Sequence, residues 1–153
     1  MRIKLTLLAL GILLYTCKSE PKSTRGVIAE HAMVVSARQE ASKIGRDILE
    51  QGGNAFDAMF ATEMALAVTY PYAGNLGGGG FMVYRLHTGE TGALDYREKA
   101  PMAAGRDMYL DSLGNVIPHK STVGAYAVGV PGTIAGIFAA HEKFGTLPIK
   151  TLL

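Results

Sequence analysis

The sequence of 153 residues contains no tryptophan, five phenylalanines and a single cysteine. One cysteine excludes an internal disulfide framework and a zinc site built from several cysteines. Because large aromatic side chains are scarce, the core has to be assembled from Ala, Val, Ile, Leu and Met. With 48% hydrophobic and 18% charged residues, the chain is too apolar to be a disordered tail.

A strong excess of charge is also missing, since 15 Lys and Arg stand against 13 Asp and Glu and give a formal net charge of +2. Arg2 and Lys4 precede an apolar run, residues 5–14, which is too short to span a bilayer and has the layout of a secretory signal. Without these two cations, 13 basic and 13 acidic residues remain. A neutral body lacks the cationic excess that neutralises phosphates, so we expect no nucleic acid partner.

The single cysteine, Cys17, follows this apolar run. Leu14 lies three residues before it, and this spacing resembles the lipobox of bacterial lipoproteins, in which the cysteine becomes the lipid-bearing N-terminus. The two intervening residues are bulkier than usual for that motif, so an ordinary signal peptide with an incidental cysteine is the alternative. We expect a signal over residues 1–16, a polar tether over 17–26, and an exported protein, periplasmic or membrane-anchored as a bacterial lipoprotein.

Beyond residue 26, the hydrophobic pattern predicts an α+β fold in which a hairpin of two helices packs on a sheet. We expect a strand over residues 32–36, helices over 37–51 and 55–69, strands over 81–87 and 92–97, and helices over 131–144 and from 148 onward. Ser36 and Asn54 are placed to cap the first two helices, which Gly52 separates. The first hairpin strand is almost continuously apolar, which predicts a central strand covered on both faces. Residues 98–124 predict a long loop, and residues 127–130 an extended segment.

Gly77 to Gly80 form the most conspicuous local motif. Such a run lets the backbone approach a ligand, and its N–H groups can bind an anion. It lacks the Lys-Ser/Thr of a phosphate-binding loop, and a strand follows it where a dinucleotide fingerprint requires a helix. A tight bend beneath close-packed helices is the alternative.

Arg97 ends the second hairpin strand and can present its guanidinium fork to a carboxylate, with Asp95 or Glu98 holding it in place. An exposed ion pair with one of these acids is the alternative, and spacing alone favours it. The four histidines have no metal-ligand spacing, which predicts surface or capping roles and no metal site. No serine, threonine or cysteine lies in a nucleophile motif. We therefore expect no catalytic residue in this chain.

Several ordered blocks, taken together, resemble the N-terminal part of the large subunit of γ-glutamyltranspeptidases (glutathione hydrolases). The most specific are Gly52-Gly-Asn-Ala-Phe-Asp-Ala58 and Val130-Pro-Gly-Thr133. The complete set covers residues 31–36, 48–58, 74–81, 95–101, 128–136 and 144–148. An apolar helix start at residues 147–153 agrees with a longer precursor, so we expect residues 27–153 to be a fragment.

The resemblance implies part of an N-terminal-nucleophile hydrolase, an αββα sandwich whose precursor, a zymogen, cleaves itself into large and small subunits. It further implies that a threonine of the small subunit, beyond Leu153, attacks γ-glutamyl amides such as glutathione and passes the acyl group to water or to an amino acid or peptide. Arg97 matches the arginine of the family's Asp-x-Arg-Glu motif, which implies that it binds the α-carboxylate of the γ-glutamyl donor. No cofactor is implied, and the chain alone should be inactive. A truncated, non-catalytic lipoprotein that binds γ-glutamyl compounds or a protein partner is the alternative.

Overall fold

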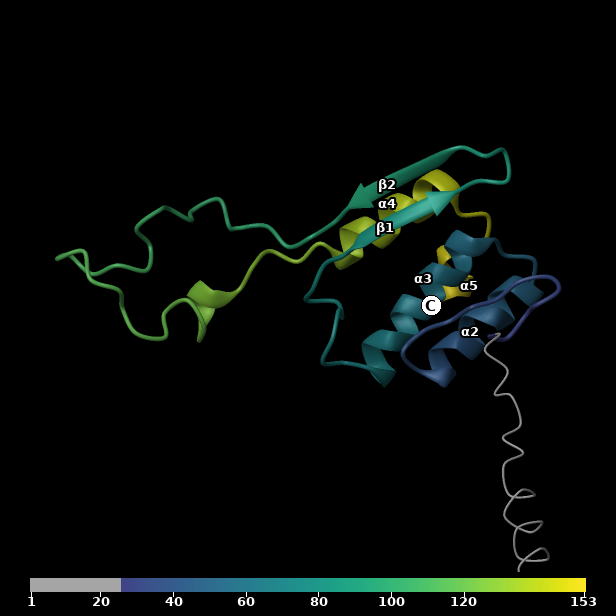
Figure 1. Cartoon of the computed structure of the whole chain (residues 1–153), viewed down its shortest axis with the longest axis horizontal. Helices are drawn as coiled ribbons and strands as arrows, with labels where there is room; N and C mark the ends of the chain where they lie inside the picture. The colour runs from purple at the N-terminus through teal and green to yellow at the C-terminus, as the bar shows by residue number, and fades with distance from the viewer. Residues whose placement is uncertain (1–25) are drawn as a thin grey trace, which may run out of the picture. The chain divides into compact units, whose positions relative to one another are not determined.

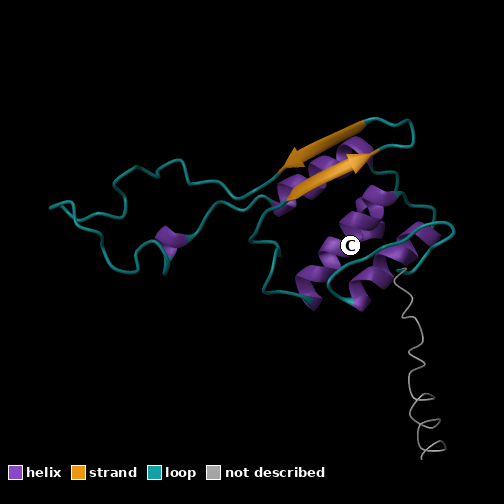
Figure 2. Cartoon of the chain, viewed as in Figure 1, coloured by secondary structure: helices purple, strands orange, loops and turns teal. Residues whose placement is uncertain are grey.

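The structure, a computed structural model, describes residues 26–153 (Figures 1 and 2). The chain divides into two compact units, and the second, Ala32–Leu153, carries the helices and strands described below. The expected signal, Cys17 and nearly all of the expected tether lie outside the described residues. Within residues 26–153, every helix is too short or too polar to cross a membrane.

The first two helices are joined as the sequence predicts. Helix α2 (Gln39–Glu50) ends before Gly52, whose φ of 90° lies in the left-handed region that glycine adopts easily. Helix α3 (Ala55–Thr69) begins with a capping box. The Asn54 side chain accepts hydrogen bonds from the backbone of Phe56 and Asp57, and the Asp57 carboxylate accepts one from the Asn54 N–H. The reciprocal bonds satisfy N–H groups that have no partner within the helix.

The predicted strand over residues 32–36 is wrong. These residues have no strand partner in the described part of the chain, and Met33 and Val35 are 49% and 80% exposed. An apolar run forms a strand only where another strand satisfies its backbone. The predicted cap is wrong as well, because α2 begins after Arg38, while the Ser36 hydroxyl donates to the Arg38 carbonyl.

The two predicted hairpin strands form an antiparallel pair. Strand β1 (Phe81–Arg85) runs beside β2 (Thr91–Asp95), with Phe81 opposite Asp95. Alternate residues of both strands are exposed, and Val83 is 83% exposed. The prediction that β1 is covered on both faces is therefore wrong for the described chain, since the helices of this unit cover one face and leave the other open.

The other helices pack around α3. Helix α2 packs on α3, while α4 (Thr133–Phe144) and α5 (Ile149–Leu152) also contact α3, and α4 packs on β2 (Figure 1). The core lies between these helices and consists of Ile48, Ala58, Phe60, Ala61, Ile137 and Leu152. A hollow of about 480 Å³ lies between α3 and β1. The helix that packs most closely on the sheet is therefore α4, and the α2–α3 hairpin approaches it mainly through α3.

A long loop leaves the hairpin after β2 and returns to α4 (Figure 2). As predicted, residues 98–124 are irregular, and one isolated bridge, between Leu110 and Val116, lies entirely within them. A single helical turn, η1 (Ala125–Ala127), replaces the start of the predicted extended segment. Val130 then pairs with Lys99, so that the returning chain lies beside the segment that follows β2.

Candidate functional site

Arg97 stands two residues beyond the end of β2. Its backbone N–H donates to Asp95 Oδ1 at 2.9 Å, and its side-chain Nε donates to Glu98 Oε2, also at 2.9 Å. The guanidinium carbon lies 5.7 Å from the centre of the Phe81 ring. The Arg97 side chain is 59% exposed. The structure thus shows the ion pair that spacing favours, on a side chain that solvent can still reach.

This geometry leaves much of the guanidinium fork open. Among residues 26–153, no hydrogen bond is made by the two terminal nitrogens of Arg97. Hydrogen bonding, first from the Glu98 backbone N–H and then from the Arg97 side chain, holds the pKa of Glu98 below its ordinary value. Glu98 is therefore a charged partner that steadies Nε. The terminal nitrogens can donate to a second carboxylate in bidentate geometry.

Arg97 also lines a hollow of about 300 Å³ between the end of β2 and α4. Its other charged lining residues are Asp95 and Lys99. The hollow is the right scale for a small ligand fragment, although whether Arg97 binds one stays a prediction.

As the glycine run enters β1, the backbone N–H and C=O groups of Gly78 and Gly80 are hydrogen-bonded to other backbone groups. Gly78 N–H donates to Asn75, and the Gly78 carbonyl accepts from the N–H groups of Gly132 and Thr133 at 2.8 and 3.1 Å. Gly80 exchanges both backbone bonds with Tyr96. The run therefore joins β1 to the start of α4, which favours the tight-bend interpretation over an anion site.

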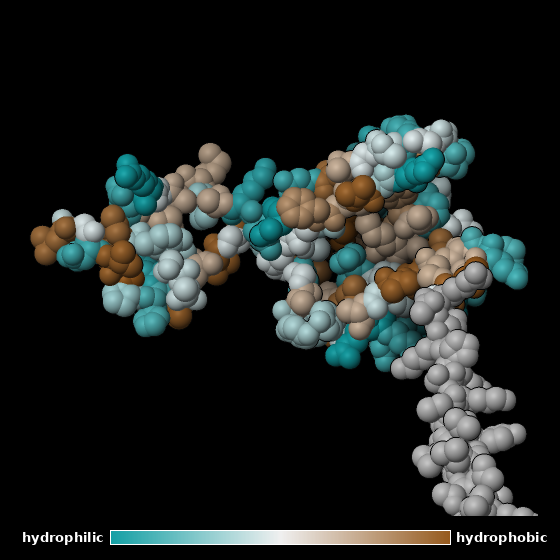
Figure 3. Space-filling view, viewed as in Figure 1, coloured by the Kyte–Doolittle hydropathy of each residue, from teal (hydrophilic) through white to brown (hydrophobic). Residues whose placement is uncertain are grey.

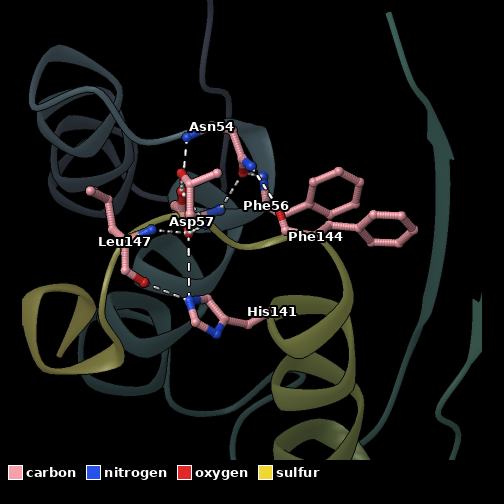
Figure 4. A network of polar contacts seen from close by, with 7 residues as sticks. Asn54, Phe56, Asp57, His141, Phe144 and Leu147 are labelled. Atoms are coloured by element: carbon pink, nitrogen blue, oxygen red, sulfur yellow. Dashed lines mark hydrogen bonds and ion pairs between the residues drawn. The ribbon is translucent and has the colours of Figure 1, made fainter. Parts of the chain in front are cut away.

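A buried polar network, which the sequence reasoning did not identify, centres on Asp57 (Figure 4). The Asp57 side chain is fully buried. It accepts hydrogen bonds from the Asn54 N–H at 2.9 Å, from the Thr146 N–H and hydroxyl at 3.0 and 2.6 Å, and from the Leu147 N–H at 3.4 Å. Desolvation raises the pKa of Asp57, but these hydrogen bonds outweigh it and hold the pKa below its ordinary value. Asp57 is thus a buried carboxylate that joins α3 to the segment after α4.

His141 belongs to the same network, so the prediction of a surface or capping role is wrong for this histidine. Its ring is 13% exposed, and Nε2 lies 2.8 Å from the Leu147 carbonyl and 3.6 Å from Asp57 Oδ1. The Asn54 amide donates to the Phe144 carbonyl at 2.6 Å. The network fixes the end of α4 against the start of α3. The Asn-x-x-Asp spacing of the capping box was the one sequence signal for it.

The other titratable groups in residues 26–153 form neither a metal site nor a recognisable catalytic site. Within the described residues, no three His, Cys, Asp or Glu side chains are grouped to hold a metal ion. Glu63 lines both the hollow beside β1 and an apolar hollow of about 640 Å³ formed by residues 32–36, α2 and α3. Burial raises the pKa of Glu63. No described nucleophile lies beside it in a recognisable catalytic arrangement.

The comparisons with known proteins agree with one another. The family model described as Gamma-glutamyltranspeptidase matches residues 41–153. The chain belongs to the γ-glutamyltranspeptidase family. It is 55% identical over 125 residues to the glutathione hydrolase proenzyme of Pseudomonas sp. (strain A14), and 50% identical over 127 residues to that of Escherichia coli (strain K12). These alignments cover 82% and 83% of this chain and 22% of each relative.

The fold agrees with the solved structures of γ-glutamyltranspeptidases. The described structure resembles the crystal structure of the Helicobacter pylori enzyme with a TM-score of 0.78 and 48% sequence identity, over 84% of this chain and 37% of that one. The enzyme from Pseudomonas nitroreducens, solved in complex with L-DON, gives a TM-score of 0.76 at 49% identity, over 82% of this chain and 37% of that one. The predicted family and the predicted α+β, partial N-terminal-nucleophile hydrolase fold are therefore confirmed. The chain spans about a fifth of the length of the curated relatives it matches.

Proposed function

We propose that this chain is the N-terminal part of the precursor of an exported γ-glutamyltransferase and glutathione hydrolase. The observation that carries the proposal is the 55% identity over 125 residues to a glutathione hydrolase proenzyme of which the chain covers 22%. The blocks around Asn54 and Arg97 both fall within residues 41–153, which the family model matches. The small subunit released from the same precursor would be the main partner.

The exposed apolar side chains of the chain support the proposal that it is part of a larger protein. Phe81 and Val83 are 64% and 83% exposed on the open face of the hairpin, and Met102 is fully exposed on the long loop. The space-filling view shows apolar side chains at the surface of both regions (Figure 3). Apolar side chains exposed to this degree are often covered in the functional assembly. In the proposed protein, other parts of the precursor pack against these side chains.

The proposed reaction is acyl transfer through a covalent intermediate. The N-terminal threonine of the small subunit attacks the γ-carbonyl of the donor, its α-amine takes the hydroxyl proton, and that proton passes to the leaving amine as the amide bond breaks. Water or the amine of an amino acid or peptide then attacks the γ-glutamyl ester and releases the threonine. In this scheme Arg97 binds the donor α-carboxylate through its open terminal nitrogens, while Glu98 holds Nε.

An assay with γ-glutamyl-p-nitroanilide tests this function. The full-length protein is expected to process itself into two subunits and release p-nitroaniline, faster when a dipeptide acceptor is added. Residues 26–153 alone are expected to release none, because the nucleophile lies elsewhere. A full-length protein that folds but neither processes nor releases p-nitroaniline would support the non-catalytic alternative.

Export with a lipid anchor on Cys17 belongs to the same proposal. Globomycin blocks the peptidase that removes lipoprotein signals, so it is expected to make the unprocessed precursor accumulate in cells that express the full-length protein. Replacing Cys17 with serine is expected to prevent attachment of the lipid. Globomycin should then no longer make the precursor accumulate. Signal removal that proceeds normally in globomycin would assign residues 1–16 to an ordinary signal peptide.

A further inference from the structure

Tyr96 is enclosed by glycines from two segments that are distant in the sequence. On the side of β1, a Cβ atom on Gly79 would lie 2.6 Å from the Tyr96 carbonyl oxygen, and one on Gly80 would lie 2.8 Å from the Tyr96 ring. On the side of α4, a Cβ atom on Gly132 would overlap the Tyr96 carbonyl oxygen, and one on Gly136 would overlap the Tyr96 Cβ and Cγ atoms. We call these four glycines the glycine cage.

The cage holds both the backbone and the side chain of Tyr96. Its N–H donates to the Gly80 carbonyl at 3.0 Å, and its carbonyl accepts from the Gly80 N–H at 3.3 Å. The Gly132 backbone is fixed in turn by its bond to Gly78. Real Cβ atoms almost never approach another atom within 3.0 Å, so each cage position admits only glycine unless Tyr96 moves, and at Gly79 the backbone between Arg97 and Glu98 would have to move as well.

Tyr96 and Arg97 are consecutive residues just beyond the end of β2, and both line the hollow beside α4. Tyr96 packs onto Gly136 of α4, and the Arg97 guanidinium lies near the Phe81 ring. A shift of Tyr96 therefore carries the Cα of Arg97 with it. Because a bidentate pair needs both nitrogens aligned with both carboxylate oxygens, a displacement below 1 Å is enough to weaken it.

We infer that Tyr96, held by the glycine cage, is a positioning residue that fixes the backbone from which Arg97 reaches the donor α-carboxylate. The inference rests on the proposed function. It gives the glycine run and the Val-Pro-Gly-Thr block a common structural role, because both leave room for Tyr96 between β1 and α4.

The first test is Gly136→Ala in the full-length protein. Alanine favours a helix more than glycine does, so α4 itself gains from the change and any loss has to come from the overlap with Tyr96. The KM for γ-glutamyl-p-nitroanilide is expected to rise about tenfold, with kcat within about twofold of the unsubstituted value. Gly77→Ala is the matched control from the same run as Gly79 and Gly80, because a Cβ there meets nothing within 4 Å. Its KM is expected to stay unchanged.

A double-mutant cycle identifies Tyr96 as the group that responds. Tyr96→Phe keeps the ring in the cage and is expected to keep the original KM. Tyr96→Ala is expected to raise KM, and adding Gly136→Ala to it should cost little more, since the atoms that overlap are gone. Purely additive effects, or a fall in kcat with KM unchanged, would overturn the positioning role.

A donor without the α-carboxylate, 4-aminobutyryl-p-nitroanilide, separates failure of this inference from failure of the proposed function. The cage variants are expected to leave kcat/KM for this donor unchanged within about twofold, because it makes no bond to Arg97. If Arg97→Lys raises KM for the full donor but Gly136→Ala does not, the inference alone fails. If neither variant affects KM, Arg97 does not bind the donor, and the inference fails together with the Arg97 assignment. The proposed function itself fails only if the full-length protein releases no p-nitroaniline.

Discussion

Replacing Asp57 with alanine is expected to lower the free energy of unfolding by about 3 kcal/mol or more. The carboxylate is fully buried and accepts from three backbone N–H groups and one hydroxyl. Alanine removes the acceptor that these four donors share and removes half of the capping box of α3. Urea unfolding of the full-length protein, followed by circular dichroism, measures the change.

Asp107→Ala is the matched control, because the Asp107 side chain is 73% exposed and lies 4.0 Å from Arg106. Its effect on the free energy of unfolding is expected to stay within about 0.5 kcal/mol.

The contribution of Asp57 to stability is also expected to depend on pH. Since its pKa is lower in the folded than in the unfolded state, its contribution is complete above the unfolded pKa and is lost as pH falls below about 4. The Asp57→Asn protein should therefore have a lower free energy of unfolding at pH 7. That free energy should also change less with pH in the acid range. An Asp57→Ala protein as stable as the unsubstituted one would contradict the network.

Arg97→Lys is expected to raise the KM for γ-glutamyl-p-nitroanilide by about ten- to a hundredfold, with little change in kcat. Lysine keeps the charge but replaces a planar fork with a single point of contact, which loses one or more charge-assisted hydrogen bonds. The loss is expected in KM because the α-carboxylate is bound equally in the ground state and the transition state. Steady-state kinetics of the self-processed full-length protein measures both constants.

Arg106→Lys controls for the loss of an arginine as such, since the Arg106 side chain is 97% exposed. It is expected to leave both constants unchanged. If Arg97→Lys also leaves KM unchanged, Arg97 is an exposed ion-pair partner of Glu98 and the donor carboxylate is bound elsewhere.

The helices and the hairpin were predictable because their signals are local. Asn54 and Gly52 mark the ends of α3 and α2 by cap chemistry that involves only residues within one turn. The hairpin follows from two apolar runs joined by a short, glycine-containing turn. Arg97 was found through the family motif, since its spacing alone favours the ion pair that the structure indeed contains.

The errors concern partners that local sequence does not show. Residues 32–36 are apolar enough for a strand, but they lack a neighbouring strand in the described chain. The continuous apolar pattern of β1 suggested two covered faces, and here only one is covered. His141 has no informative spacing, and its burial beside Asp57 depends on a contact between residues 84 positions apart.

By itself, the sequence determined the family, the helical hairpin and the arginine at the end of β2, because these depend on ordered motifs and on interactions between near neighbours. Only the tertiary structure decided what the glycines do. It brings Gly80 and Gly136 to opposite sides of Tyr96, and it brings Thr146 to the carboxylate of Asp57. Steric exclusion and buried hydrogen bonds act between atoms that folding brings within a few ångströms, and residue spacing along the chain does not record those distances.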